Sequence, residues 1–376
     1  RAGAALTLEP LGEGAADMVY DDLTEAVGQV VERVSTPWTR DDARTLAALS
    51  AAGLVFVAAL LLATTPPDAL TALDSYSVTR YNVIAGAIGI VAALLVTATS
   101  AVMTRKYPQA SGIALAHTVP FLTAASALRL SQSHWDTAGW GWTGLGLLIG
   151  SLAVLALPKR YRISIAAPLV VGTVLAATGL LVRLGQLSQA GISAILFALV
   201  IVLLQVAPWI ALAHIPVRIL DADTTEQIPA KGITDQVSTS FVFVVALRAG
   251  GAIAALFLAV ALMTAPETRS ISLPLTLIVL GAVSLVLQTR SIRARVEVLL
   301  GALTGLIVIL VATVLGAYAD PRTMPWLTLS AIATALVLVI TNVVGPRARP
   351  HLTRIADTIS VLSLFVLLPL AVYLWS

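Results

Sequence analysis

The sequence predicts an all-α polytopic membrane protein with eleven transmembrane helices, and three observations support this class. Apolar stretches, each about 20 residues long, fill most of the chain after about residue 45, and about 20 apolar residues are what a helix needs to cross a bilayer. The 376 residues are 58% hydrophobic and 11% charged, whereas soluble domains carry about 25% charged residues. Backbone groups in lipid must be hydrogen-bonded within their own segment, so we expect the spans to be helices.

The N-terminal residues precede these spans and have a different character. Residues 1–18 are small and acidic and are typical of a linker, and residues 19–34 predict a short amphipathic helix. Its apolar positions recur at helical spacing. They are the candidate partner interface: Val19, Leu23, Val27, Val30 and Val34. Such a stripe is expected either to bind a partner or the membrane surface, or to pack on the cytoplasmic helix ends. We therefore interpret residues 1–44 as a cytoplasmic linker.

Residues 45–376 are predicted to form the transmembrane domain. The expected spans are 45–65, 82–103, 109–130, 141–157, 162–182, 190–212, 240–263, 270–288, 296–318, 324–344 and 355–375. Most connections are short, so consecutive helices are expected to be antiparallel neighbours. The polar stretch at about 213–239 is the exception, and it divides the helices into six and five.

The distribution of positive charge predicts the orientation, because cytoplasmic loops carry the excess of Lys and Arg. With the N-terminus in the cytoplasm, 17 of the 23 lysines and arginines lie in inside segments and five in outside segments. The C-terminus is then outside. This alternation supports the count of eleven spans, since a wrong count would scramble it.

Ionisable residues inside the spans are the default candidates for a functional site. No acidic residue lies near the middle of a predicted span, although Glu297 and Asp357 lie at cytoplasmic ends. This absence weighs against a proton- or sodium-coupled carrier. Arg248 is the one cation within a span. It is expected either to contact a helix, a subunit or an anionic lipid head group, or to extend back to the interface.

Two further spans carry a polar residue three positions before a proline. His117 precedes Pro120, and Gln205 precedes Pro208. These pairs are consistent with kinked helices beside a cavity, or with simple kinks and interhelical hydrogen bonds.

A catalytic serine finds little support. Gly191-Ile192-Ser193 matches the G-x-S pattern of rhomboid-like proteases, but this motif alone is weak. His214 is about 21 residues further along the same predicted helix, which is roughly 30 Å at 1.5 Å per residue. It is therefore too far away to act as the base.

Small residues at helical spacing indicate close helix–helix contacts. Together with Arg248, they are the candidate helix-packing or dimer contacts: Gly146 and Gly150, Gly301 and Gly305, and Gly250 within an Ala246-Gly250-Ala254 series. In a protein with this many helices most such faces pack within the chain, and a subunit interface is the alternative.

Composition and motifs also limit the chemistry. The chain has no cysteine, which excludes disulfides, thiol catalysis and zinc–thiolate sites. It carries no P-loop, zinc signature or dinucleotide fingerprint, so no cofactor is expected. The net charge of +3 is too small to imply nucleic acid.

The chain resembles the EccD family, the polytopic membrane component of actinobacterial type VII (ESX) secretion systems. The resemblance is carried by the segment 19–27 (VYDDLTEAV), the entry of Pro37-Trp38-Thr39 into the first span, the eleven predicted spans, and the polar loop between spans six and seven. It covers essentially the whole chain, but its motifs are diffuse and include no catalytic signature.

The resemblance implies a location in the bacterial inner membrane and an upstream ubiquitin-like domain in the cytoplasm. It also implies a dimer that encloses a lipid-lined vestibule, and partners of the EccB, EccC (an ATPase) and EccE types. Secreted pairs of small helical proteins would pass through the assembled complex. The family has no known catalytic residue, so none is assigned here.

The leading hypothesis is therefore a non-catalytic scaffold or channel-associated subunit of a type VII secretion complex. A secondary transporter or lipid flippase is the alternative, and it predicts a polar site around Arg248, His117 and Gln205. An intramembrane enzyme is the weakest hypothesis.

Overall fold

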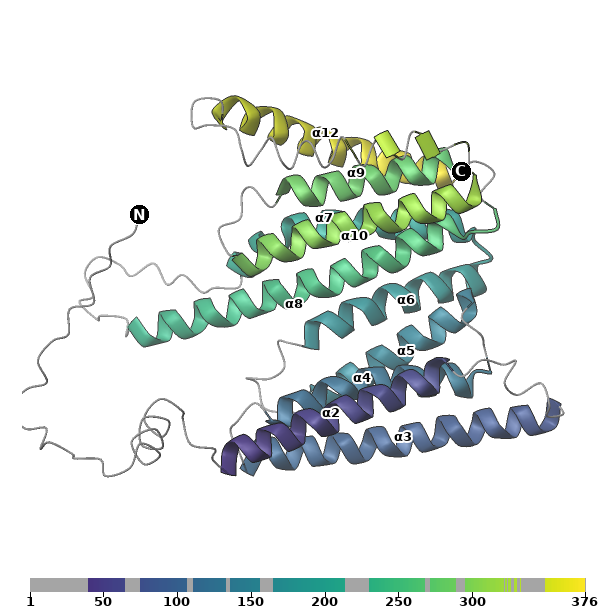
Figure 1. Cartoon of the computed structure of the whole chain (residues 1–376), viewed down its shortest axis with the longest axis vertical. Helices are drawn as coiled ribbons and strands as arrows, with labels where there is room; N and C mark the ends of the chain where they lie inside the picture. Colours follow the sequence, from purple (N-terminus) through teal and green to yellow (C-terminus); the bar gives the residue numbers. More distant parts are fainter. Residues whose placement is uncertain are drawn as a thin grey trace, which may run out of the picture. The chain divides into compact units, whose positions relative to one another are not determined.

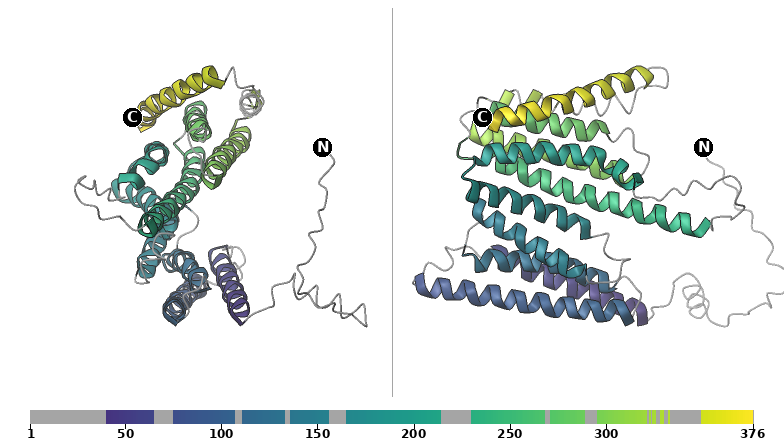
Figure 2. Two further views of the ribbon diagram at one scale, coloured as in Figure 1. Left: turned by 90° about the vertical axis from the view of Figure 1, so that its left-hand side faces the viewer. Right: turned by 180° about the vertical axis from the view of Figure 1, so that it is seen from behind.

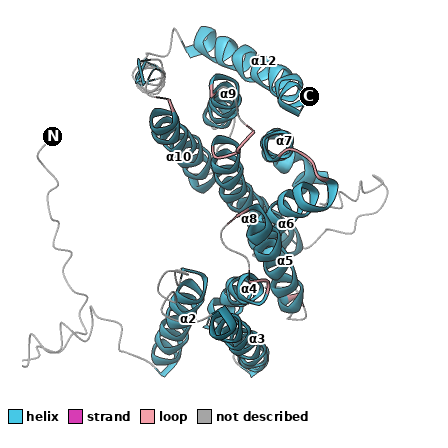
Figure 3. Ribbon diagram, turned by 90° about the vertical axis from the view of Figure 1, so that its right-hand side faces the viewer, coloured by secondary structure: helices cyan, strands magenta, loops and turns pink. Residues whose placement is uncertain are grey.

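The computed structural model describes the transmembrane helices and leaves several connections out. It describes residues 40–64, 75–106, 111–132, 136–155, 165–213, 230–267, 271–288, 295–320 and 349–375, with a few isolated positions between 322 and 332. Within these ranges the regular structure is helical and includes no strand (Figure 3). The predicted all-α class is confirmed for this part of the chain.

Ten helices are present among the described residues, and each overlaps one predicted span. They are α2 (Arg40–Thr64), α3 (Ser75–Lys106), α4 (Ser111–Leu130), α5 (Thr137–Val154), α6 (Ala166–Gly185), α7 (Gln189–Ala213), α8 (Ala230–Met263), α9 (Ser272–Gln288), α10 (Arg295–Ala319) and α12 (Arg349–Trp375). Eight of them are long and apolar enough to cross a membrane. The helices α5 and α9 are shorter, at 18 and 17 residues.

Two differences from the predicted spans have a physical reason. Helix α8 begins ten residues before the predicted span at 240, and α3 begins seven residues before 82. Hydropathy detects only the apolar part of a helix, whereas a helix continues into polar surroundings wherever the backbone permits it. The predicted span 324–344 lies almost entirely outside the described residues, so the count of eleven stays a prediction, as does the orientation.

Local signals explain where some helices begin and end. Asp136 caps α5, since its side chain accepts a hydrogen bond from the backbone N–H of Gly139 at 2.8 Å, which satisfies one of the unpaired donors of the first turn. Helix α6 ends where Gln186 takes a left-handed conformation with φ of 49°, a common way to terminate a helix.

Residues 48–376 form one unit in which the helices lie side by side (Figures 1 and 2). Helices α3, α4, α5 and α6 pack in chain order, and α6 then packs on α8. Helix α8 also packs on α7 and α10, while α9 lies against α10 and α12, and α12 returns to α7. The largest apolar core is shared by α7, α8, α9, α10 and α12.

Large apolar side chains cover much of the outer surface of this unit. Leu94 and Leu95 on α3, Leu310 on α10 and Phe365 on α12 are each at least 60% exposed. Such extensive apolar exposure is unusual for a soluble monomer. It is what helices solvated by lipid require, and it agrees with the multi-pass class.

Candidate functional site

Five polar side chains come together where α7, α8, α9 and α10 meet, and we call this group the polar junction. It consists of Gln205 on α7, Arg248 on α8, Ser284 and Gln288 on α9, and Glu297 on α10. All five lie within predicted spans, where an unpaired polar group is costly. Their contacts therefore decide whether the junction is structural or binds something.

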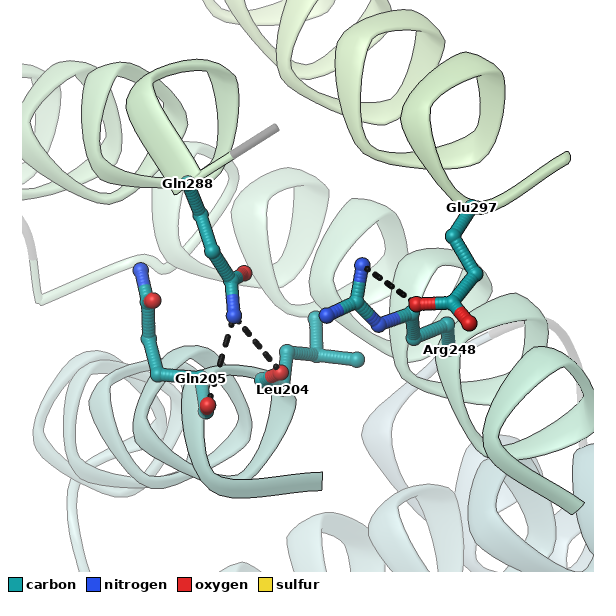
Figure 4. Close-up of polar contacts among 5 residues, drawn as sticks. All are labelled: Leu204, Gln205, Arg248, Gln288 and Glu297. Atoms are coloured by element: carbon teal, nitrogen blue, oxygen red, sulfur yellow. Dashed lines mark hydrogen bonds and ion pairs between the residues drawn. The ribbon is translucent and has the colours of Figure 1, made fainter. Parts of the chain in front are cut away.

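Arg248 is buried and forms an ion pair with Glu297 (Figure 4). Its Nη1 lies 3.4 Å from Oε2 of Glu297, and the two residues are 5% and 8% exposed. Glu297 lies in the first turn of α10, where the helix dipole favours a carboxylate. Arg248 therefore joins α8 to α10.

The amides of the junction tie α7 to α9. The Gln205 side-chain amide donates to the Ser284 hydroxyl at 2.8 Å and to the Ser284 carbonyl at 3.3 Å. The Gln288 amide donates to the carbonyl oxygens of Leu204 and Gln205, both at 3.3 Å. Hydrogen bonds of this kind stabilise helix pairs in lipid.

Four of the five predicted glycines lie against another helix of the same chain. A Cβ at Gly146 would come within 2.5 Å of the Thr123 carbonyl oxygen on α4, and one at Gly150 within 2.7 Å of Pro120 Cα. A Cβ at Gly250 would lie 2.5 Å from the Ala167 carbonyl oxygen on α6, and one at Gly305 would lie 2.5 Å from Val286 Cγ2 on α9.

Gly301 lines a small cavity beside Arg248. None of these contacts bears on a second copy of the chain, so a dimer role stays a prediction.

The candidate partner interface from Val19 to Val34 lies outside the described residues.

The sequence reasoning missed the most extensive helix contact among the described residues, which lies between α5 and α6. A Cβ at Gly144 would come within 2.8 Å of the Ala176 Cα and of the Gly172 carbonyl oxygen, and Gly141 lies against Gly179 in the same way. In the sequence, the signal that could have found this contact is the seven-residue spacing between Gly172 and Gly179. Residues seven positions apart lie two turns apart on one face of a helix.

The pairing of Arg248 with Glu297 was also missed. Glu297 was placed at the cytoplasmic end of one predicted span and Arg248 within another. An intramembrane arginine needs a partner, and Glu297 is an acidic residue toward the same, cytoplasmic, side. The two observations together make Glu297 a candidate partner, but only the tertiary arrangement shows that the two helices meet.

The remaining polar candidates do not form a reactive set. Ser193 is 0% exposed and lies within the largest core, out of reach of a substrate. His117 Nδ1 lies 2.7 Å from the Ile113 carbonyl oxygen of its own helix. In the described residues no cluster of His, Asp and Glu could hold a metal ion.

Two apolar cavities lie between the spans. One of about 510 Å³ is bordered by α3, α4 and α5, and one of about 300 Å³ by α2, α4, α5, α6 and α8. Apart from a few Ser and Thr hydroxyls their linings are apolar, so neither cavity presents charged groups to a polar substrate.

The described part of the chain is thus an all-helical, multi-pass membrane domain whose buried polar groups join its own helices. The family model described as the EccD-like transmembrane domain matches residues 43–376. The chain therefore belongs to the EccD family, the membrane components of type VII (ESX) secretion systems, as its resemblance indicated.

Solved structures share this fold. A chain from protomer 1 of the ESX-3 core complex superposes with a TM-score of 0.68 at 17% identity, over 96% of this chain and 81% of that one. A chain from the MycP5-free ESX-5 inner membrane complex in State II gives 0.65 at 15% identity, over 88% and 77%. A comparison with curated proteins finds no match.

Proposed function

We propose that this chain is a non-catalytic membrane scaffold of a type VII secretion complex. The family match over residues 43–376 is the observation that carries this proposal, because it spans all but the first few residues of the described helices. The two similar structures come from inner membrane or core complexes of ESX systems, which supports a place in an assembly of that kind.

The structural use of the buried polar groups supports the scaffold role. Arg248 and Glu297 pair with each other, and Gln205 and Ser284 do the same. A carrier needs polar groups that exchange between the protein and a substrate. Groups that already join four helices are better suited to holding a fixed shape.

The finer details of the proposal follow from the resemblance. Two copies would form a dimer around a lipid-lined vestibule in the bacterial inner membrane. The cytoplasmic linker at 1–44 and the loop at about 213–239 would contact partners of the EccB, EccC and EccE types. Exposed apolar faces such as that of α10 suit either lipid or a second copy.

A secondary transporter is less well supported. The three residues that this hypothesis needs do not act together, because His117 bonds to its own helix α4 while Arg248 and Gln205 belong to the polar junction. Helix α4 packs mainly against α3 and α5.

The first test measures the size and composition of the native assembly. The tagged chain is extracted from its own membranes in a mild detergent, sized on a native gel, and analysed by mass spectrometry. We expect a very large assembly that contains an ATPase and membrane partners with few spans. A monomer or dimer of the 39.1 kDa chain alone under gentle extraction would reject the scaffold proposal.

The second test determines the orientation. Because the chain has no cysteine, single cysteines can be introduced and labelled with an impermeant thiol reagent. Glu267→Cys lies in an exposed turn after α8 on the predicted outer side, and Ser291→Cys lies on the predicted inner side. We expect the first to be labelled in intact cells and the second only after the membrane is opened. The reverse pattern would overturn the orientation.

A further inference from the structure

The guanidinium of Arg248 has more hydrogen-bond donors than its ion pair uses. Nη1 faces Glu297, while Nε and Nη2 are buried and contact no acceptor in the described part of the chain. Nε carries one N–H and Nη2 carries two. A buried donor without a partner is expensive and is rare in folded proteins. These atoms therefore call for an acceptor that the described part of the chain does not supply.

A cavity of about 10 Å³ lies at this position. Its lining includes Arg248 itself, Leu204, Gln288, Gly301 and Thr304, which bring together α7, α8, α9 and α10. In Figure 4 the guanidinium lies between Glu297 on one side and the Gln288 side chain on the other. The cavity is thus part of the polar junction and not a separate surface feature.

The size of the cavity selects its occupant. About 10 Å³ is close to the least volume that holds one water molecule, and a buried water also needs two to four polar partners. A phosphate or a lipid head group is several times larger. Since Glu297 already balances the charge of Arg248, the site calls for a neutral acceptor and not for an anion.

We propose that this cavity binds one ordered water molecule, which accepts a hydrogen bond from the Arg248 guanidinium and donates to side-chain oxygens on α9 and α10. Thr304 is the acceptor on α10. Its hydroxyl donates to the Leu300 carbonyl oxygen at 2.5 Å, so the oxygen lone pairs remain to accept. The Gln288 amide oxygen is the acceptor on α9. The water joins α8 to both helices, and the site does not depend on which complex the chain enters.

The direct test is a density map of the full chain, purified in lipid nanodiscs with the subunits that accompany it, at a resolution that shows ordered waters. We expect one compact peak within hydrogen-bonding distance of the Arg248 guanidinium and Thr304 Oγ1. An empty cavity at that resolution would overturn the proposal, and so would elongated or tetrahedral density from a lipid or a phosphate.

A pair of matched variants tests the role of the acceptor. Thr304→Val removes the hydroxyl at nearly constant volume, and Thr304→Ser keeps it. Thr313→Val is the control, because Thr313 lies on the same helix and makes the same type of bond, to the Ile309 carbonyl oxygen at 2.8 Å, away from the cavity.

We expect Thr304→Val to lose the water peak and to lower the midpoint of thermal unfolding more than Thr313→Val does. Thr304→Ser should keep the peak. Equal midpoints for the two valine variants, or a peak that survives Thr304→Val, would reject the proposed acceptor. If Thr304→Val does not fold, the maps of the unchanged chain and of Thr304→Ser decide.

Discussion

The helices α4, α5 and α6 and the helices α7 to α10 are held together by different chemistry. The first group relies on glycines that let backbones approach, such as Gly144 against Ala176 and Gly146 against Thr123. The second group also has glycines, but it adds the polar junction, with an ion pair and side-chain amide bonds. One region is thus joined mainly by close backbone packing, with one hydroxyl bond from Thr123 to the Gly146 carbonyl oxygen at 2.7 Å. The other is also joined by an ion pair and by side-chain amides that span helices.

The difference shows how a helical protein is specified in lipid. Lipid tails are as apolar as leucine, so burying an apolar side chain against a neighbouring helix gains little. Close packing and polar pairing are the two remaining sources of specificity. Close packing works best where both helices are small-residue rich, and polar pairing fixes register where larger side chains keep the helices further apart. The two regions should therefore respond differently to mutation.

The largest effect is expected from removing the charge of Arg248. Arg248→Met keeps much of the side-chain length but leaves Glu297 buried without its partner. Breaking a buried ion pair in this way costs about 3–5 kcal/mol. We expect a correspondingly lower unfolding midpoint when tryptophan fluorescence is followed during titration with SDS in mixed micelles.

A double variant separates the ion pair from general damage at this position. Arg248→Met with Glu297→Leu removes both charges, and replacing a buried pair by apolar residues is often nearly neutral. We expect the double variant to recover most of the lost stability. If it is as unstable as Arg248→Met alone, the pairing is not what makes Arg248 important.

An intermediate effect is expected where backbones touch. In Gly144→Ala the new methyl group would meet the backbone of Ala176 on α6, which cannot rotate away as a side chain could. Overpacking of this kind costs about 1–3 kcal/mol. The matched control is Gly53→Ala on α2, where an added Cβ has no neighbour within 4 Å. It should be neutral or stabilising by about 0.5–1 kcal/mol, and equal losses in both variants would contradict the contact.

Much of this fold could be predicted from the sequence because hydropathy is a strong signal over 20 residues. Each of the ten described helices overlaps a predicted span, and helix α9 was placed within two residues of its start. Helix starts in polar sequence, such as that of α8 at Ala230, were missed because no change in hydropathy marks them.

The candidate site was predicted residue by residue but not as an arrangement. Arg248, Gly250 and Gln205 were each singled out, yet nothing local indicates which helix each one faces. The Arg248–Glu297 pair joins residues 49 positions apart in two helices. The α5–α6 contact depends on matching two sets of glycines on different helices. Both require the tertiary arrangement, which single-helix periodicity does not contain.

The smallest effect is expected from the amide that joins α7 to α9. Gln205→Leu removes the bonds to the hydroxyl and the carbonyl oxygen of Ser284. Interhelical hydrogen bonds in membranes are worth about 0.6 kcal/mol on average and up to about 1.7, so the SDS midpoint should fall only slightly. Because partners in one contact are not additive, Gln205→Leu with Ser284→Ala should cost less than the two single changes summed.

Secretion by cells that carry Gln205→Leu should persist, since a fixed scaffold tolerates one weakened contact. A carrier that binds substrate through Gln205 would lose its activity while its stability hardly changed, and that result would move the function from scaffold to transport.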